Sequence, residues 1–259
     1  MFVFVFYYYL ERPLAGGVAT LLLATLPAFL TYCRSSMSEI TASTFVAGAF
    51  LFTYLGLKNE RRWPIYTGAV LLGLAFNIRT QIAFFAPLVL AIGLLPSRTD
   101  RARWLAHCAG AILAFSLAAS PTFILNTFQF KNLLKTGYEF WVPQLFEPHT
   151  LFSPRYIPKQ LGMLWSHCAL QRSDFNIAHV FGTGTYYVPA YVTLLIAGVA
   201  FVRFNRFTLW ALFAVVVFFI ATISYSFVDG RCYVPLLVVS VGLAALPVEW
   251  AMRSLRWSK

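Results

Sequence analysis

Long apolar segments alternate with short polar connections along most of this 259-residue chain. A helix that crosses the hydrocarbon core of a bilayer, about 30 Å thick, needs about 20 mostly apolar residues. The apolar segments predict spans at 14–31, 40–57, 65–78 paired with 82–95, 104–123, 186–202, 207–227 and 232–250. We therefore expect an all-α, polytopic bundle of transmembrane helices, built as a single transmembrane domain over residues 1–259.

One pair of apolar segments is shorter than two full crossings of a membrane. The stretch WPIYTGAVLLGLAFNIRTQIAFFAPLVLAIGLLPS has basic flanks, KNERRW before it and SRTDRAR after it, which indicates that both its ends lie on one side. Helical arms of this length rise only about 21 Å, which predicts a broken short hairpin whose polar turn, residues 77–81, lies below the opposite surface. Arg79 in that turn would face a cavity open to the outer side. Alternatively, Arg79 pairs with an acid such as Glu39 or extends outward to water.

The composition excludes a soluble globular domain, because 59% of the residues are hydrophobic and only 11% are charged. The net charge of +11 is explained by basic residues at the cytoplasmic ends of the spans, so no nucleic-acid partner is expected. The residues expected on the cytoplasmic side are Arg12, Lys58, Arg61, Arg62, Arg98, Arg101, Arg103, Arg203, Arg206, Arg253, Arg256 and Lys259. The opposite short connections contain Arg34, Arg79 and Arg231, and a long outer loop, about 126–185, lies on the same outer side.

Three arginines at the outer ends of three hairpins form the main candidate site. Arg34, Arg79 and Arg231 lie on the side where excess positive charge is not expected, and a guanidinium matches phosphate oxygens with two parallel hydrogen bonds. This pattern favours a lipid-linked phosphate held at the outer edge of the membrane. Ser38 and Glu39 are explained equally well as the start of a capped helix, and Asp229 could cap the last span while pairing with Arg231.

The long outer loop contains prolines and aromatic residues without a sustained apolar run of membrane-spanning length. This composition predicts short interfacial helices and loops, with Trp141 and Trp165 anchored at the level of the headgroups. Aromatic side chains there could also stack on sugar rings, although anchoring is the simpler explanation. The four histidines show no metal-ligand spacing, so no metal site is assigned.

Four short motifs follow one another in an order that is typical of one family. These are SE at the start of a span, GAVLLGLAFNIRTQIAFFAPLVLAIGLL, NTFQFKNLLKTGY and RCYVP at the start of the last helix. Together they resemble the bacterial membrane glycosyltransferases of the dolichyl-phosphate-mannose protein mannosyltransferase type. These enzymes belong to the GT-C superfamily, which includes the aminoarabinose transferases of lipid A. In the third motif, Lys131 occupies a position where the family usually has a glycine.

The resemblance implies a glycosyltransferase that moves a sugar from a polyprenyl-phosphate carrier to an acceptor, which is a glycan, lipid or protein, on the periplasmic side. It also implies a multi-pass location in the cell inner membrane of a bacterium. The predicted substrate-binding residues are Arg34, Ser38, Glu39, Arg79, Tyr138 and Arg231. No cofactor is assigned, although some GT-C enzymes require a divalent metal.

The catalytic residue is not assigned from this sequence. In the family, an acidic residue in the first outer loop acts as general base on the acceptor hydroxyl. The opening MFVFVFYYYLERP provides only about 15 Å of apolar helix and resembles the second half of an internal helix. We therefore expect the family's N-terminal helix and first catalytic loop to lie upstream of Met1 or to be lost. A lipid or solute transporter or flippase, marked by paired broken helices, and a non-catalytic membrane subunit remain alternative functions.

Overall fold

The computed structural model describes residues 11–26, 29, 38–94, 101–133, 151–168, 193–202, 205–226 and 230–257. The helices are α2 (Pro13–Thr25), α4 (Ser38–Lys58), α5 (Arg62–Ile78), η1 (Thr80–Leu94), α6 (Arg101–Phe130), η3 (Pro154–Tyr156), α9 (Ile157–Cys168), α12 (Arg206–Ile223), η4 (Gly230–Tyr233) and α13 (Val234–Trp257), where η marks a 3₁₀ helix. A further helical stretch covers residues 193–200. The predicted all-α fold is confirmed. The opening residues 1–10 lie outside the described part, as does most of the outer loop.

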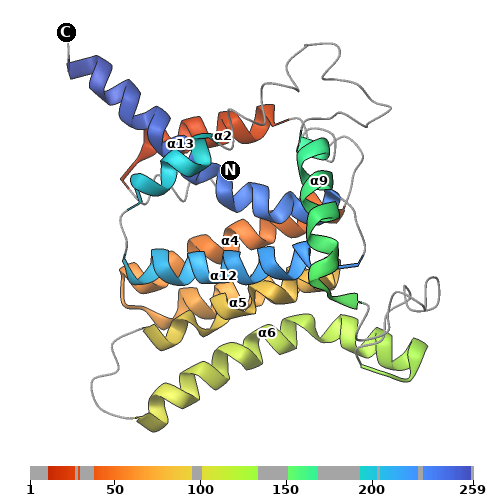
Figure 1. The fold of residues 1–259 in the computed structure, drawn as a ribbon. Coiled ribbons are helices and arrows are strands. Elements are labelled where there is room, and N and C mark those ends of the chain that lie inside the picture. Colours follow the sequence, from red (N-terminus) through yellow and green to blue (C-terminus); the bar gives the residue numbers. More distant parts are fainter. Residues whose placement is uncertain are drawn as a thin grey trace.

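The described helices form a bundle centred on α4, α5 and η1 (Figure 1). α6 packs on α5 and η1, α12 packs on η1, and α13 packs on α2 and α4. Among the described residues, four helices are long and apolar enough to cross a membrane, namely Ser38–Lys58, Trp104–Phe130, Arg206–Ile223 and Val234–Leu255. The chain is therefore a multi-pass membrane protein, as the hydrophobic pattern predicts.

The broken hairpin is present, but its second arm is not an α-helix. α5 begins at Arg62 and ends at Ile78, and the chain continues after Arg79 as the 15-residue 3₁₀ helix η1. A 3₁₀ helix rises about 2.0 Å per residue, so η1 extends about 30 Å, close to the thickness of a hydrocarbon core. The expected rise of about 21 Å assumed α-helical geometry and is too small for this arm. Hairpin length alone therefore does not place Arg79 below the outer surface.

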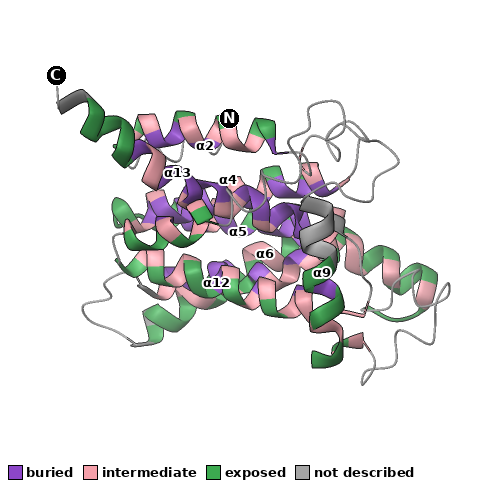
Figure 2. Cartoon of the chain, turned by 45° about the horizontal axis from the view of Figure 1, so that its top comes forward, coloured by how far each residue is buried: buried purple, intermediate pink, exposed green. Residues whose placement is uncertain are grey.

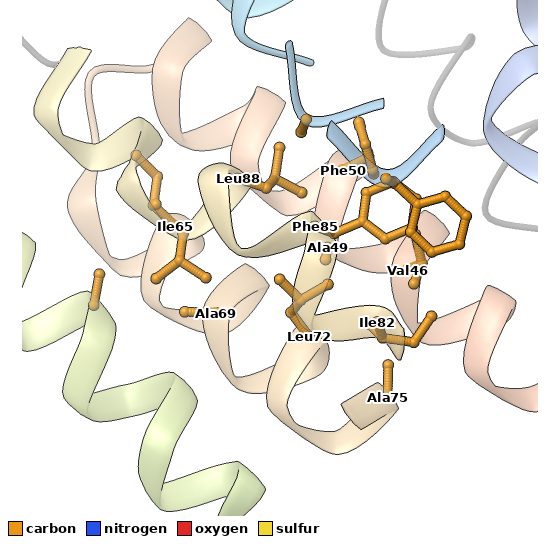
Figure 3. Packing of buried hydrophobic residues seen from close by; sticks show 14 of the residues in the cluster. Val46, Ala49, Phe50, Ile65, Ala69, Leu72, Ala75, Ile82, Phe85 and Leu88 are labelled. Atoms are coloured by element: carbon orange, nitrogen blue, oxygen red, sulfur yellow. The ribbon is translucent and has the colours of Figure 1, made fainter. Parts of the chain in front are cut away.

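The buried face of η1 follows the period of a 3₁₀ helix. Ile82, Phe85, Leu88 and Ala91 are spaced three apart, and all four are almost fully buried. Figure 3 shows Phe85 among the side chains of the main core, where its ring stacks on Phe218 of α12 with centroids 4.3 Å apart. Side chains three apart lie directly above one another in a 3₁₀ helix. The three-residue spacing thus forms one straight row that fills the space between α4, α5 and α12.

Three of the predicted cytoplasmic cations lie together at one end of the bundle. Arg12, before α2, lies 3.6 Å from Glu249 of α13, and Arg253 donates to the same carboxylate at 2.8 Å. Lys58 at the end of α4 lies 3.6 Å from Glu11. Glu249 is buried, so its two arginine partners offset the cost of removing its charge from water. The predicted grouping of Arg12, Lys58 and Arg253 is confirmed.

α6 lies at the edge of the bundle and presents most of its surface outward. Within the described part, 11% of the most apolar 18-residue stretch of α6 is buried in the bundle. The corresponding share for α4 is 56%. Figure 2 shows this difference as many buried residues on α4 and mainly exposed and intermediate residues on α6. Most of its exposed side chains are aliphatic or aromatic, including Leu113, Leu117 and Phe128. Such a surface is suited to contact with lipid chains.

Candidate functional site at the outer end of the bundle

The start of α4 and the turn of the hairpin meet at the end of the bundle opposite Lys58, which is the end predicted to face the outer side. Arg79 donates from Nη2 to the carboxylate Oε1 of Glu39, and its Nε donates to the hydroxyl of Ser38 at 3.0 Å. The Ser38 hydroxyl in turn lies 3.4 Å from Glu39 Oε2. Three of the predicted site residues are therefore in contact. The alternative in which Arg79 pairs with Glu39 is the arrangement that the structure contains.

Burial makes this ion pair unequal. The side chain of Glu39 is 1% exposed, whereas that of Arg79 is 22% exposed. Glu39 also lies in the first turn of α4, where the partial positive charge of the helix N-terminus stabilises a carboxylate. The carboxylate is thus held from two sides, while the guanidinium has one edge toward the outside. Within the described residues, Arg79 Nη1 has no hydrogen-bond partner.

The hairpin turn also contacts the start of the last helix. Gln81 Nε2 lies 3.4 Å from the backbone carbonyl of Cys232 in η4. Arg231 directly precedes Cys232, so the backbone places Arg231 near the turn that contains Arg79. The side chain of Arg231 is outside the described part, as are Arg34 and Tyr138. The predicted convergence of the three arginines therefore remains a prediction.

A buried polar contact that the sequence did not indicate holds α9 on the bundle. Gln160 is 1% exposed; it donates to the carbonyl of Tyr225 at 2.8 Å and accepts from the hydroxyl of Tyr233 at 3.0 Å. Next to this contact, Phe152 pairs with Tyr225 in an isolated antiparallel bridge. These contacts fix the segment that contains α9 to η4 and to the residues that follow α12. In the sequence, Gln160 is one polar residue in an amphipathic segment, and nothing there indicates that it is buried.

The backbone at Lys131 has a conformation that favours glycine, which is the residue that the sequence resemblance implies at this position. Lys131 has φ 54°, in the left-handed region, and its N–H donates to the carbonyl of Thr127 at 3.0 Å, directly after α6 ends. Glycine is the usual residue at such a helix end because it has no Cβ to clash with the carbonyl. The departure from the motif therefore retains the glycine-like conformation at the end of α6.

The site described above belongs to a multi-pass helical membrane protein in which an arginine and a carboxylate pair at one end of the bundle. Residues 1–124 match the family model described as dolichyl-phosphate-mannose-protein mannosyltransferase. This match confirms the resemblance to GT-C mannosyltransferases over that part of the chain, and it supports a membrane glycosyltransferase of the GT-C type. No curated protein and no solved structure matches the chain. The resembling motifs after residue 124 lie outside the matched part.

Proposed function

We propose that this chain is a GT-C-type membrane glycosyltransferase that moves a sugar from a polyprenyl-phosphate carrier to an acceptor. The proposed location is the inner membrane of a bacterium, with the acceptor on the periplasmic side. The observation that carries the proposal is the Arg79 guanidinium, held by Ser38 and Glu39 at the outer end of the bundle. All three residues lie within the part that the mannosyltransferase family model matches.

The chemistry of transfer gives each of these groups a role. As the sugar leaves its carrier, negative charge develops on the carrier phosphate, and a fixed cation stabilises it. Ser38 and Glu39 orient the guanidinium of Arg79, which leaves its Nη1 edge for a phosphate oxygen. Because Glu39 already balances one positive charge, Arg34 and Arg231 would supply the cations that a phosphate needs. Tyr138 would contact the sugar. The general base on the acceptor stays unassigned.

Binding of a polyprenyl-phosphate-linked sugar to the full chain in lipid nanodiscs tests the phosphate role. Arg79→Ala should weaken binding about 10- to 100-fold, as expected for loss of a hydrogen bond to a charged group. Arg79→Lys should recover only part of the affinity, because an ammonium lacks the planar fork. Arg155, an exposed arginine of the outer loop whose partner is Tyr156, provides the control, and Arg155→Ala should bind like the wild type.

Loss of Arg79 also removes a charged partner of the buried Glu39, so folding has to be separated from binding. The double variant Arg79→Ala/Glu39→Gln removes both charges, and it should regain stability while its affinity stays low. Equal affinities of the wild type and Arg79→Ala would contradict the phosphate role. Carrier binding without any sugar transfer to periplasmic glycan, lipid or protein acceptors would favour the non-catalytic subunit instead.

A further inference from the structure

α6 contains a proline at position 121, and this residue interrupts the helix's own hydrogen bonds. Proline has no N–H, so the carbonyl of Leu117 loses its usual backbone donor. The hydroxyl of Ser120 donates to that carbonyl at 2.8 Å. In an apolar membrane interior, every backbone group freed by such a break must find another partner.

The side chain of Asn77 from α5 enters α6 at this break. Asn77 Nδ2 donates to the carbonyl of Ala118 at 2.6 Å, and Asn77 Oδ1 accepts from the N–H of Thr122 at 3.1 Å and from its hydroxyl at 2.8 Å. The carbonyl of Ala118 and the N–H of Thr122 are partners of each other in a regular α-helix. The side-chain amide of Asn77 thus bonds both the backbone acceptor and the backbone donor of a single helical turn.

The surface of α5 next to Asn77 is shaped for this close approach. Gly73 lies one turn before Asn77, on the same face. A Cβ added at Gly73 would lie 2.5 Å from the carbonyl oxygen of Phe115 and 2.7 Å from the Cβ of Ala118. The missing side chain at Gly73 therefore allows α6 to come near enough for the short Asn77 side chain to reach its backbone.

We propose that Asn77 is a positioning residue that fixes the direction of the outer part of α6, residues 122–130, relative to the hairpin turn. Asn77 lies two residues before Arg79. The same turn therefore carries the ion pair with Glu39 and the hydrogen bonds to the backbone of α6 at its break. The chain enters the outer loop directly after α6. Asn77 thereby sets where that loop begins relative to Arg79. This inference concerns geometry and does not depend on the proposed sugar transfer.

Distances between pairs of spin labels test this role in the full chain. Labels are attached to cysteines introduced in place of exposed residues, after replacement of the four native cysteines. The pair Leu105 and Gln129 spans the break in α6, and the pair Thr44 and Gln129 relates its outer part to α4. The wild type should give one narrow distance distribution for each pair. Asn77→Leu should broaden or shift both distributions.

A second substitution separates positioning from general packing. Pro121→Ala restores an N–H for the Leu117 carbonyl and removes the ring that distorts this turn. The N–H of Thr122 and the carbonyl of Ala118 can then bond each other without Asn77. In the Pro121→Ala background, adding Asn77→Leu should leave a narrow distribution for the label pair within α6. The cost of Asn77→Leu in the unfolding equilibrium, about threefold for each interhelical hydrogen bond lost, should also fall in that background. Thr67→Ala, which removes a hydroxyl bonded within α5 itself, is the matched control and should change neither distribution.

Three outcomes would overturn the proposal. The first is an unchanged pair of distributions in Asn77→Leu. The second is that Asn77→Leu changes the unfolding equilibrium equally in the wild-type and Pro121→Ala backgrounds. If Asn77→Leu does not fold, the test becomes whether Pro121→Ala restores folding to it, and failure to do so is the third.

Discussion

Arg79 and Glu39 lie 40 residues apart in the sequence, and their side chains form an ion pair that joins the hairpin turn to the start of α4. The carboxylate is almost completely buried, and the guanidinium is partly exposed. Because of this difference, we expect the loss of each side chain to lower the free energy of unfolding by a different amount.

Removal of Arg79 should destabilise the protein more than removal of Glu39. Arg79→Gln removes the guanidinium that pairs with a buried carboxylate, and breaking a buried pair in this way costs about 3 to 5 kcal/mol. Glu39→Gln leaves a cation that can still reach water, so we expect a smaller loss. The double variant should lose less than the sum of the two. Unfolding in mixed micelles measures all four proteins, and additive losses would contradict coupling between the residues.

Lys131→Gly should stabilise the end of α6. The left-handed conformation at this position costs about 1 to 2 kcal/mol for a residue with a Cβ, and glycine avoids this cost. Lys131→Val should destabilise the protein, since a β-branched side chain tolerates the conformation poorly. The midpoint of thermal unfolding in detergent provides the measurement. A loss of stability on Lys131→Gly would show that the lysine side chain, rather than the backbone, matters here.

A pair of glycines tests the close packing of α5 and α6. Gly73→Ala places a Cβ within 2.5 Å of the Phe115 carbonyl, so it should separate the helices and lower the free energy of unfolding by about 1 to 3 kcal/mol. Gly17→Ala in α2 meets no atom within 4 Å, and it should be neutral or stabilising by up to about 1 kcal/mol. Similar effects of the two substitutions in a denaturation series would be inconsistent with tight contact at Gly73.

The contact of Gln160 with Tyr233 should control how firmly α9 is held. Tyr233→Phe removes the hydroxyl that donates to the buried Gln160 oxygen, a loss of about 1 to 3 kcal/mol. Hydrogen exchange measured by mass spectrometry should then accelerate in residues 157–168, while exchange in α4 stays at the level of the wild type. Uniform acceleration over the whole chain would instead indicate global destabilisation.

The sidedness of the chain can be read with an impermeant thiol reagent in intact cells that have a permeabilised outer membrane. In a background without native cysteines, a cysteine at the exposed Lys159 should react, because the outer loop is predicted to face the periplasm. A cysteine at Glu60, in the turn between α4 and α5, should react only after the inner membrane is opened. The reverse labelling pattern would move the candidate site to the cytoplasmic side.

The sequence predicted the elements of the fold well, because membrane spans are set by local hydrophobic length. The broken hairpin was expected at 65–78 and 82–95, and it occupies Arg62–Ile78 and Thr80–Leu94. The pairing of Arg79 with Glu39 was an alternative to the predicted outer-side cavity, since an arginine at such a turn needs a partner. By contrast, the contact of Gln160 with Tyr233 joins residues 73 positions apart, and nothing local marks the partner. The amide of Asn77 likewise has a defined role only when α6 lies beside it.

The straight buried row of η1 has a consequence for sequence variation in this arm. In an α-helix, steps of three residues rotate by about 60°, so four such positions would face different neighbours. In η1, Ile82, Phe85, Leu88 and Ala91 are stacked in one line. A change in the volume of one of these side chains therefore alters the packing of the side chains three positions before and after it. Related chains that retain this arm should show coordinated changes in side-chain size with a period of three, rather than alternating periods of three and four.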